Sequence, residues 1–160
     1  LGLFVPVRPA QAPRQAIGGR SSRAEQSSQA ACRGITILIE PLNKYDAPRY
    51  FLSTTDQALE IIKAVSLPNL KLMFDCYHVQ LMEGDLTHRV ETLLPKIGHI
   101  QFASVPDRGA PDHGEINFEH VFRSISELGY DKPLGAEYKP AEYTEHSLSW
   151  LRLFKSTGET

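Results

Sequence analysis

The chain has 160 residues, of which 41% are hydrophobic and 22% are charged, and its formal net charge at pH 7 is −2. This composition is typical of a globular domain and excludes collagen-like or strongly charged disordered chains. Because Lys and Arg are not in excess, the charge gives no reason to expect nucleic acid or a membrane surface as a partner.

The N-terminal segment, residues 1–33, differs in composition from the rest of the chain. Ala, Gln, Arg, Ser, Pro and Gly dominate it, and no helical or strand period is sustained after Val7. We predict a poorly structured leader here, with at most a weak helix over residues 16–31. Residues 34–160 are predicted to form the folded domain.

The first predicted strand covers residues 35–39, because β-branched apolar side chains occupy both of its faces, and it ends at Glu40. Thr54 and Gln57 have the spacing of a capping box and predict the start of a helix that ends before Pro68. Its buried face is predicted to consist of Ala58, Ile61, Ile62 and Val65.

Three further strand and helix pairs follow, with strands predicted over residues 70–74, 97–103 and 133–136. Asn117 and Thr144 are the predicted N-caps of the last two helices, and Gly129 ends the first of these two. The three helices are predicted to bury Leu86, Val90, Leu93 and Leu94, then Phe118, Val121, Phe122, Ile125 and Leu128, and finally Leu148, Leu151 and Phe154. Successive units of this kind imply an α/β fold with a parallel sheet and right-handed crossovers, either open or closed as a (β/α) barrel.

Polar residues stand at the C-terminal ends of all four predicted strands: Glu40, Asp75, Gln101 and Glu137. In a parallel α/β barrel these ends converge on one mouth, where such folds carry their active sites. Any one of them could instead cap a helix or face solvent, but four in register favour a barrel and a shared site. Three carboxylates and an amide oxygen form an all-oxygen set, which suits Mg²⁺ or Mn²⁺ better than zinc.

Four segments in chain order carry a family resemblance. They are Ile37-Leu-Ile-Glu-Pro-Leu-Asn43, Phe74-Asp-Cys-Tyr-His78, Gly98-His-Ile-Gln101 with Pro106-Asp-Arg108 and Gly114-Glu-Ile-Asn117, and Gly135-Ala-Glu-Tyr-Lys-Pro140. Over residues 34–154 the chain resembles the hydroxypyruvate isomerase family of xylose isomerase-like TIM barrels, whose close relatives are the 2-oxo-tetronate isomerases.

This resemblance implies an isomerase that interconverts hydroxypyruvate and 2-hydroxy-3-oxopropanoate (tartronate semialdehyde) by proton transfer through an enediolate. It implies a divalent metal held by Glu40, Asp75, Gln101 and Glu137, with Glu40 and Glu137 also acting as proton donor and acceptor. The residue types suit the chemistry, because a Lewis acid stabilises an enediolate and two flanking carboxylates can move the proton. In the allied ketose 3-epimerases a histidine stands at the Gln101 position, so Gln101 favours the hydroxypyruvate branch.

Two further residues are predicted to bind substrate. In the related epimerases a histidine at the position of His78 contacts a substrate oxygen, although a structural role is an equal alternative. Arg108 offers a planar fork suited to a substrate carboxylate, with a solvated loop arginine as the alternative. His113 and His99 are weaker candidates, and we interpret Cys76 as a packed thiol.

The resemblance also implies that the chain is the C-terminal half of a (β/α)8 TIM barrel, because a complete barrel needs about 250 residues. The leader does not resemble the preceding units, and a shifted reading frame or a mispredicted start is our hypothesis for it. The strands at Ile35 and Leu134 would then be exposed barrel edges, which predicts a homo-oligomer or aggregation.

Other functions stay open at this point. A 2-oxo-tetronate isomerase or a sugar 3-epimerase would use the same site, and Arg108 would discriminate between a 2-oxo acid and a neutral sugar. A truncated, non-catalytic fragment that serves as an interaction module is the alternative outside enzymes. A DNA-repair phosphodiesterase is disfavoured, because its two- and three-metal sites use several extra His and carboxylate ligands.

The cysteines and the apolar runs indicate location. Cys32 and Cys76 are far apart and form no CxxC or zinc-ligand motif, which favours a reducing compartment. Apolar runs such as residues 35–39 are far shorter than the about 20 residues that span a bilayer, and no signal-peptide pattern is seen. We therefore predict a cytoplasmic protein, with glyoxylate-type metabolism as the setting that the resemblance implies.

Overall fold

The computed structural model describes residues 3–4, 30, 33–141 and 143–155. The strands are β1 (Leu3–Phe4), β2 (Ile37–Ile39), β3 (Leu70–Asp75), β4 (Ile97–Phe102) and β5 (Leu134–Ala136). The helices are α2 (Thr55–Val65), α3 (Cys76–Met82), α4 (Leu86–Leu93), α5 (Phe118–Glu127) and α6 (Leu151–Lys155), with 3₁₀ turns η1 (Leu94–Lys96) and η2 (His146–Trp150).

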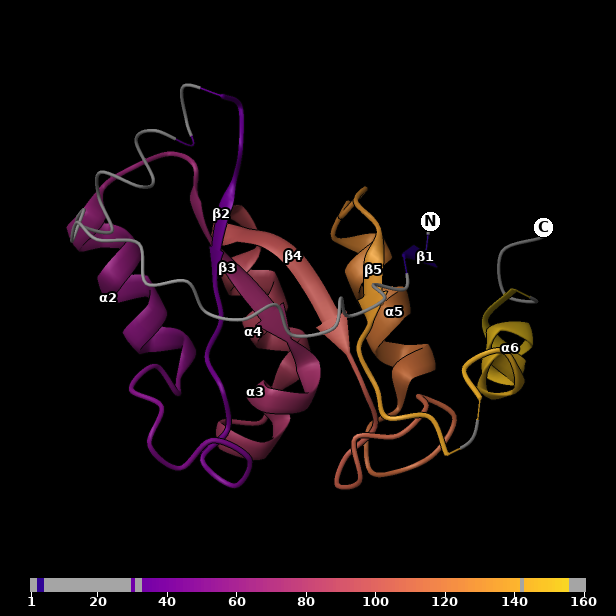
Figure 1. The fold of residues 1–160 in the computed structure, drawn as a ribbon. Coiled ribbons are helices and arrows are strands. Elements are labelled where there is room, and N and C mark those ends of the chain that lie inside the picture. The colour runs from indigo at the N-terminus through magenta and orange to yellow at the C-terminus, as the bar shows by residue number, and fades with distance from the viewer. Residues whose placement is uncertain (1–2, 5–29, 31–32, 142, 156–160) are drawn as a thin grey trace.

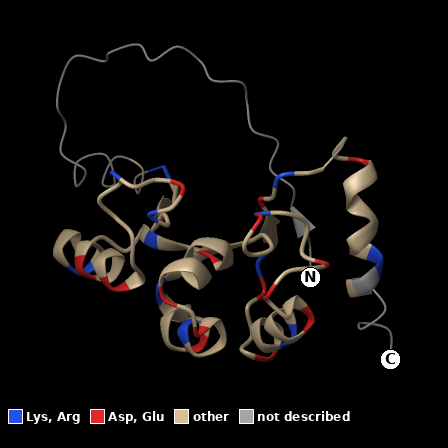
Figure 2. Cartoon of the chain, turned by 90° about the horizontal axis from the view of Figure 1, so that it is seen from below, with Lys and Arg blue, Asp and Glu red and all other residues tan. Residues whose placement is uncertain are grey.

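The strands form one parallel sheet in the order β1-β5-β4-β3-β2. Each strand from β2 to β5 is followed by a helix, so the described chain contains the four predicted β/α units. Figures 1 and 2 show α2, α4 and α5 side by side along one face of this sheet. The predicted α/β class with a parallel sheet is confirmed.

A short strand lies inside the predicted leader. β1 pairs with β5 through Leu3 opposite Leu134 and Phe4 opposite Gly135. The edge at Leu134, which we expected to be exposed, is therefore paired over two residues, whereas β2 ends the sheet on the other side. The predicted weak helix over residues 16–31 falls outside the described residues except for residue 30.

The two faces of the sheet differ in burial. Leu70, Leu72 and Phe74 of β3 are buried, whereas the alternating Lys71 and Met73 are only partly buried. This period of two is that of a strand with one face packed against helices. The less buried face would line the interior of a closed barrel, and its C-terminal edge carries the predicted site.

Aromatic side chains hold the C-terminal elements to the sheet. The ring of Phe102, at the end of β4, lies 4.8 Å from that of Phe122 and 5.7 Å from that of Trp150, both edge-on. Trp150 is fully buried, whereas Leu148, Leu151 and Phe154, the predicted buried face of the last helix, are only partly buried. The difference arises because the 3₁₀ turn η2 replaces the first turns of the predicted helix and changes its period from 3.6 to 3.

Helix α3 was not predicted, because it begins at the residue that directly follows β3. Asp75 is the last residue of β3 and also the N-cap of α3, where its Oδ1 accepts the backbone N–H of Tyr77 at 2.9 Å. No loop separates the two elements, so the sequence offers no turn signal.

Of the three predicted N-caps, Thr54 and Asn117 do cap α2 and α5. The prediction for Thr144 is wrong, because the last helical segment begins as the 3₁₀ turn η2 at His146, with Glu145 at its N-cap and no side-chain cap hydrogen bond.

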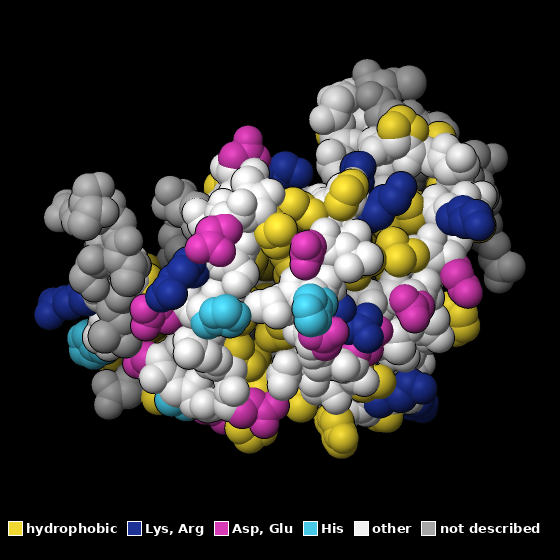
Figure 3. Space-filling view, turned by 180° about the vertical axis from the view of Figure 1, so that it is seen from behind, with side chains coloured by type: hydrophobic (Ala, Val, Ile, Leu, Met, Phe, Trp, Pro, Cys, Tyr) yellow, Lys and Arg dark blue, Asp and Glu magenta, His cyan; other side chains and the backbone are white. Residues whose placement is uncertain are grey.

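Charged side chains of both signs are mixed over the surface. Figure 2 shows acidic and basic residues interspersed along the helices, and Figure 3 shows them next to histidines and hydrophobic side chains on the face opposite to Figure 1. Among the described residues, no helix has both the length and the apolar character needed to cross a membrane. The absence of nucleic-acid and membrane partners stays a prediction.

Replacing Gly98 by Ala is expected to lower the free energy of unfolding by about 1–3 kcal/mol, which is the usual cost of overpacking. A Cβ atom at Gly98 would collide with Leu38 Cδ2 and would lie 2.8 Å from Lys71 Cβ, so the strands would have to shift. Urea denaturation measures the effect. Thr92→Ala, an exposed position on α4, is the control and should change stability by less than about 0.5 kcal/mol. Equal stability of Gly98→Ala and the parent chain would contradict the packing described.

Candidate metal and substrate site

The strand ends bring the predicted ligands to one edge of the sheet. Asp75 of β3 lies opposite Gln101 of β4, and Gln101 lies opposite Gly135 of β5. The backbone N–H of Glu137 continues this ladder by donating to the carbonyl of Phe102 at 3.1 Å. Glu40 follows directly after β2 at the same edge. The order of strands therefore places the predicted ligands in sequence along the mouth.

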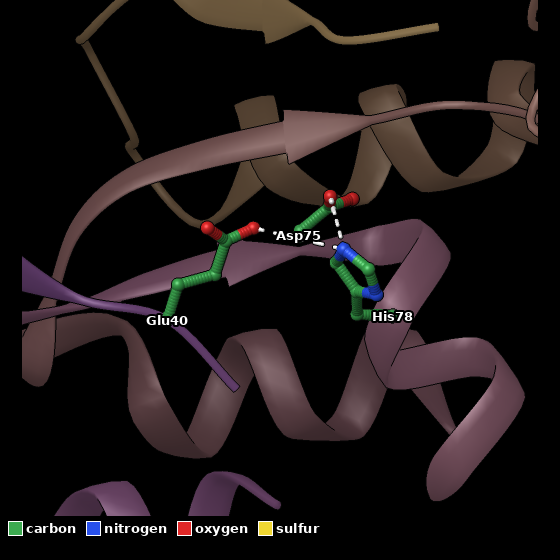
Figure 4. A group of neighbouring side chains, drawn as sticks. All are labelled: Glu40, Asp75 and His78. Carbon is green, nitrogen blue, oxygen red and sulfur yellow. Dashed lines mark ion pairs between the residues drawn. The ribbon is translucent and has the colours of Figure 1, made fainter. Parts of the chain in front are cut away.

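Glu40, Asp75 and His78 form a compact group, shown in Figure 4. One candidate ligand atom from each lies within 4.8 Å of the others. His78 Nε2 is 3.9 Å from Glu40 Oε1 and 3.7 Å from Asp75 Oδ2. Asp75 and His78 are buried, while Glu40 is partly exposed. Two acidic groups so close together favour a cation between them.

Asp75 carries its carboxylate inside the protein. Its second oxygen, Oδ2, is buried and has no hydrogen-bond partner among the described residues. Burial raises the pKa of Asp75 to about 7, and the nearby carboxylate of Glu137 adds to this rise, whereas the Tyr77 N–H and Arg108 oppose it. A buried carboxylate oxygen without a hydrogen bond is costly unless a cation binds it.

Gln101 presents a second buried oxygen to the same region. Its Oε1 has no hydrogen-bond partner in the described part of the chain, and the residue is 7% exposed. Gly135 provides the room, because a Cβ atom there would lie 3.2 Å from Gln101 Cγ and 2.8 Å from His99 Nε2. The oxygens of Asp75 and Gln101 thus fit a hard divalent cation, which prefers oxygen ligands.

Arg108 reaches the same carboxylates from the loop after β4. Its Nη2 donates to Glu137 Oε2 at 3.1 Å and lies 3.8 Å from Asp75 Oδ2. The guanidinium carbon lies 5.0 Å from the centre of the Tyr77 ring, and the side chain is 14% exposed. The contacts and the low exposure of Arg108 contradict the alternative of a solvated loop arginine. They place its planar guanidinium at the mouth of the site.

The loop that carries Arg108 has its own charged cluster. Ser104 Oγ donates to Asp107 Oδ1 at 2.5 Å, and His113 Nε2 lies 2.8 Å from Asp107 Oδ2. The other ring nitrogen of His113 lies 2.8 Å from Asp112 Oδ1. These contacts hold His113 between two carboxylates of its own loop, so the structure gives it a role in shaping the loop.

The burial of the two remaining candidates, His99 and Cys76, is that of packed residues. His99 is partly buried on the interior side of β4, two residues before Gln101, and burial lowers its pKa. Cys76 is fully buried and burial raises the pKa of its thiol, as expected for a packed residue. Neither side chain takes part in the Glu40, Asp75 and His78 group.

Sequence reasoning missed a polar network beneath His78. Asn43 donates to His78 Nδ1 from its backbone N–H at 3.0 Å, and its carboxamide bonds Asp46. The hydroxyl of Tyr77 donates to Asp46 Oδ2 at 3.0 Å. The signal that could have found it is the spacing of Asn43 and Asp46, which is typical of an Asx turn at a strand end.

Comparison with known proteins decides the family. Residues 22–154 match the sequence model of the xylose isomerase-like TIM barrel family. The chain belongs to this family. The resemblance to xylose isomerase-like barrels, based on the four sequence segments, is thereby confirmed.

Curated relatives of this xylose isomerase-like chain carry two related names. It is 45% identical over 126 residues to the 2-oxo-tetronate isomerase of Cupriavidus necator. This alignment covers 79% of this chain and 48% of that protein. It is 45% identical over 117 residues to the hydroxypyruvate isomerase of Escherichia coli, and the alignment covers 73% of this chain and 45% of that protein. The chain therefore spans about half the length of the curated relatives it matches.

Solved structures agree with the xylose isomerase-like fold. A Brucella melitensis protein described as an AP endonuclease of family 2 superposes with a TM-score of 0.78 and 39% identity, covering 82% of this chain and 51% of that one. A 3-keto-D-glucoside 4-epimerase from Escherichia coli superposes with a TM-score of 0.70 and 26% identity, covering 81% and 50%. The similar proteins thus carry the names of isomerases, an epimerase and an endonuclease.

Asp75→Asn tests the buried carboxylate. Asn keeps an oxygen that can cap α3 and removes a buried charge, so without metal the variant is expected to melt at or above the temperature of the parent chain. Mn²⁺ at about 100 times its Kd should stabilise the parent by about 2.7 kcal/mol, and Asp75→Asn should lose most of this gain. Thermal melts with and without Mn²⁺ measure both effects.

The matched control for this substitution is Asp56→Asn, an exposed residue in the first turn of α2. It changes the charge by the same amount, away from the site, and should keep the full response to Mn²⁺. An undiminished response of Asp75→Asn would contradict the assignment of its carboxylate to the cation.

The His113 cluster predicts a pH dependence. Hydrogen bonds to Asp107 and Asp112 raise the pKa of His113 above 6.5, and those from His113 and Ser104 lower the pKa of Asp107 to about 2. The stabilisation from the raised histidine is lost as pH rises through its folded pKa, and that from the lowered aspartate is lost as pH falls below 3.8 toward about 2. The cluster therefore contributes most at about pH 4–6.5.

NMR titration of the His113 ring is the measurement. Asp107→Asn should move the midpoint down toward the ordinary histidine value, because the variant removes the largest cause of the shift. Glu119→Gln, on the exposed surface of α5, should leave the midpoint in place. A midpoint that is insensitive to Asp107→Asn would refute the cluster.

Proposed function

We propose that this chain carries the metal and proton-transfer half of an isomerase that acts on a small 2-oxo acid, with hydroxypyruvate as the first candidate and 2-oxo-tetronate as the second. The observation that carries the proposal is the set of carboxylates at the ends of β2, β3 and β5, with Arg108 bound to Glu137 beside Asp75. The names of the curated relatives support the reaction class. The whole reaction is proposed for a protein of the relatives' length.

The reaction requires a proton to move between neighbouring carbons of the substrate. Glu40 and Glu137 are the proposed general base and general acid, since they stand at opposite ends of the row of strand ends that starts at β2 and finishes at β5. Each would face one of the two reacting carbons. A carboxylate can remove the proton from one carbon while the other returns it to the neighbour, with an enediolate in between.

Glu40, Asp75, Gln101 and Glu137 would hold the divalent metal, for which Mg²⁺ or Mn²⁺ are the proposed ions. When bound, such a cation supplies Lewis-acid stabilisation for the negative charge that develops on the substrate oxygens. The protein contributes two buried oxygens that have no other hydrogen-bond partner in the described chain, those of Asp75 and Gln101. These groups are already in place before the substrate binds, which lowers the reorganisation needed.

Arg108 is proposed to bind the substrate carboxylate. Its guanidinium is held by Glu137 and by the face of Tyr77 at the mouth of the site. A substrate carboxylate can accept two parallel hydrogen bonds from it, a geometry that a neutral sugar cannot match.

A sugar epimerase is the second candidate, because the Escherichia coli 3-keto-D-glucoside 4-epimerase shares the fold at 26% identity. Such an enzyme would use the same carboxylates without a need for Arg108 as a carboxylate clamp. The endonuclease name of the Brucella melitensis protein is a weaker guide. The net charge of −2 does not favour a DNA backbone, and His78 is the one histidine in the described carboxylate group.

Isomerisation of hydroxypyruvate in D₂O tests the proposal directly. With Mg²⁺ or Mn²⁺ present, NMR is expected to show 2-hydroxy-3-oxopropanoate with deuterium on carbon, and EDTA should abolish the product. Glu137→Gln keeps the shape of the side chain but cannot accept a proton, so its rate should fall by about 100-fold or more. Glu127→Gln, an exposed position at the end of α5, is the charge-matched control.

The outcomes of this assay separate the alternatives. Deuterium entry that requires both metal and Glu137 supports the isomerase. A folded, metal-binding chain without exchange would support the non-catalytic fragment and would locate the missing groups in the other half of the relatives' length.

Arg108→Ala discriminates between the two substrate classes. With hydroxypyruvate, kcat/KM is expected to fall by about 100-fold or more, because a charged hydrogen-bonded pair with substrate is lost. A neutral ketose should be affected by less than about 10-fold. Arg108→Lys keeps the charge without the fork and should recover only part of the loss. Steady-state kinetics on both substrates provides the comparison, and equal losses would favour the epimerase.

A further inference from the structure

The Nδ1 atom of His78 faces hydrogen-bond donors. The backbone N–H of Asn43 donates to it at 3.0 Å, and the Asn43 Nδ2 atom lies 2.7 Å away. A backbone N–H can only donate, so Nδ1 must offer its lone pair. A ring proton on Nδ1 would point at the proton of Asn43.

The orientation of the Asn43 carboxamide is fixed independently of His78. Its Oδ1 accepts the backbone N–H of Asp46 at 2.8 Å, and its Nδ2 donates to Asp46 Oδ2 at 3.1 Å. A reversed amide would place oxygen against the Asp46 carboxylate and nitrogen against an N–H group, so both contacts would be lost. Asn43 is fully buried, which keeps water from replacing these bonds. The carboxamide therefore also presents a donor to Nδ1.

The other ring nitrogen of His78 points into the carboxylate group. Nε2 is buried, has no hydrogen-bond partner among the described residues, and lies 3.7 Å from Asp75 Oδ2 and 3.9 Å from Glu40 Oε1. Because Nδ1 accepts the backbone N–H of Asn43, it carries no proton. An imidazole ring in a protein keeps at least one N–H, so that proton sits on Nε2.

We propose that Asn43 is a positioning residue that holds His78 as the Nε2–H tautomer, which excludes His78 from metal ligation and makes it a hydrogen-bond donor to an oxygen bound beside Glu40 and Asp75. The identification of that oxygen as a substrate oxygen rests on the proposed function; the tautomer does not. A metal ligand needs the lone pair of Nε2, and freeing it would move the proton to Nδ1, against Asn43.

The tautomer has a consequence for the choice of metal. Glu40, Asp75 and His78 look like a mixed nitrogen and oxygen site by distance alone. With the imidazole acting as a donor, the ligands that remain are oxygens, which favour Mg²⁺ or Mn²⁺ over zinc. Asn43 would thus set the metal preference without touching the metal.

The deciding experiment is ¹⁵N NMR of the His78 ring in the whole 160-residue chain at neutral pH, recorded without metal, with Mg²⁺ and with Zn²⁺. His78→Gln assigns the resonances by their loss. We expect a protonated, pyrrole-like Nε2 and an unprotonated, pyridine-like Nδ1 under all three conditions. An Nδ1–H tautomer, an even mixture, or loss of the Nε2 proton on addition of Zn²⁺ would overturn the proposal.

Two variants test whether Asn43 sets the tautomer. The exchange Asn43→Asp with Asp46→Asn conserves net charge and replaces the donor facing Nδ1 by an acceptor. It is expected to raise the population of the Nδ1–H form by about tenfold or more, which corresponds to about 1.4 kcal/mol. Asn43→Ala removes only the carboxamide and keeps the backbone N–H, so it should retain the Nε2–H form. An unchanged ratio in the double variant would refute the role of Asn43.

These spectra do not depend on activity. A chain that fails to isomerise hydroxypyruvate but shows the Nε2–H form would reject the proposed function and keep this inference. An active chain whose His78 carries its proton on Nδ1 would keep the proposed function and reject this inference. If either variant fails to fold, as judged by circular dichroism, the spectrum of the parent chain still decides the tautomer.

Discussion

The carboxylate of Asp75 is buried at the point where β3 passes directly into α3, and the site is arranged around it. One oxygen caps the helix through the N–H of Tyr77, and the other lies inside the mouth, between His78 and Arg108. A buried carboxylate destabilises a protein unless a positive group compensates it. This requirement explains why a guanidinium reaches the group from the loop after β4 and why a cation would be bound there. The buried carboxylate of Asp75 destabilises the fold when it is uncompensated, and for the same reason it binds a cation favourably.

The loop after β4 connects the fold to this chemistry. Its shape is fixed by the contacts of Asp107 with Ser104 and His113, and the carbonyl of Arg108 accepts the N–H of Lys139 at 2.7 Å, beyond β5. Arg108 itself has a φ of 57°, a left-handed conformation that is unusual for a residue other than glycine. The contacts on both sides of the residue hold it in this conformation, which directs the guanidinium toward Glu137 rather than into solvent.

The role of His78 depends on the residue behind its ring as well as on the carboxylates in front of it. By distance alone, Glu40, Asp75 and His78 form a candidate metal group. The donors of Asn43 behind the ring indicate that the nitrogen facing the carboxylates carries a proton. The same three side chains can therefore act as two ligands and one hydrogen-bond donor. The chemistry of such a site depends on the hydrogen bonds behind its residues as much as on the residues themselves.

The sequence by itself determined the parallel α/β architecture, the caps at Thr54 and Asn117, and the four polar positions at the strand ends. These depend on local periodicity and on the rule that parallel strands end at one edge, so neighbouring residues carry the information. The tertiary structure decided the pairing of Arg108 with Glu137, the contact of Asn43 with His78 and the burial of Trp150. Each of these joins residues that are distant in the chain or changes a helical period, and no local pattern encodes which donor meets which acceptor across a packed interior.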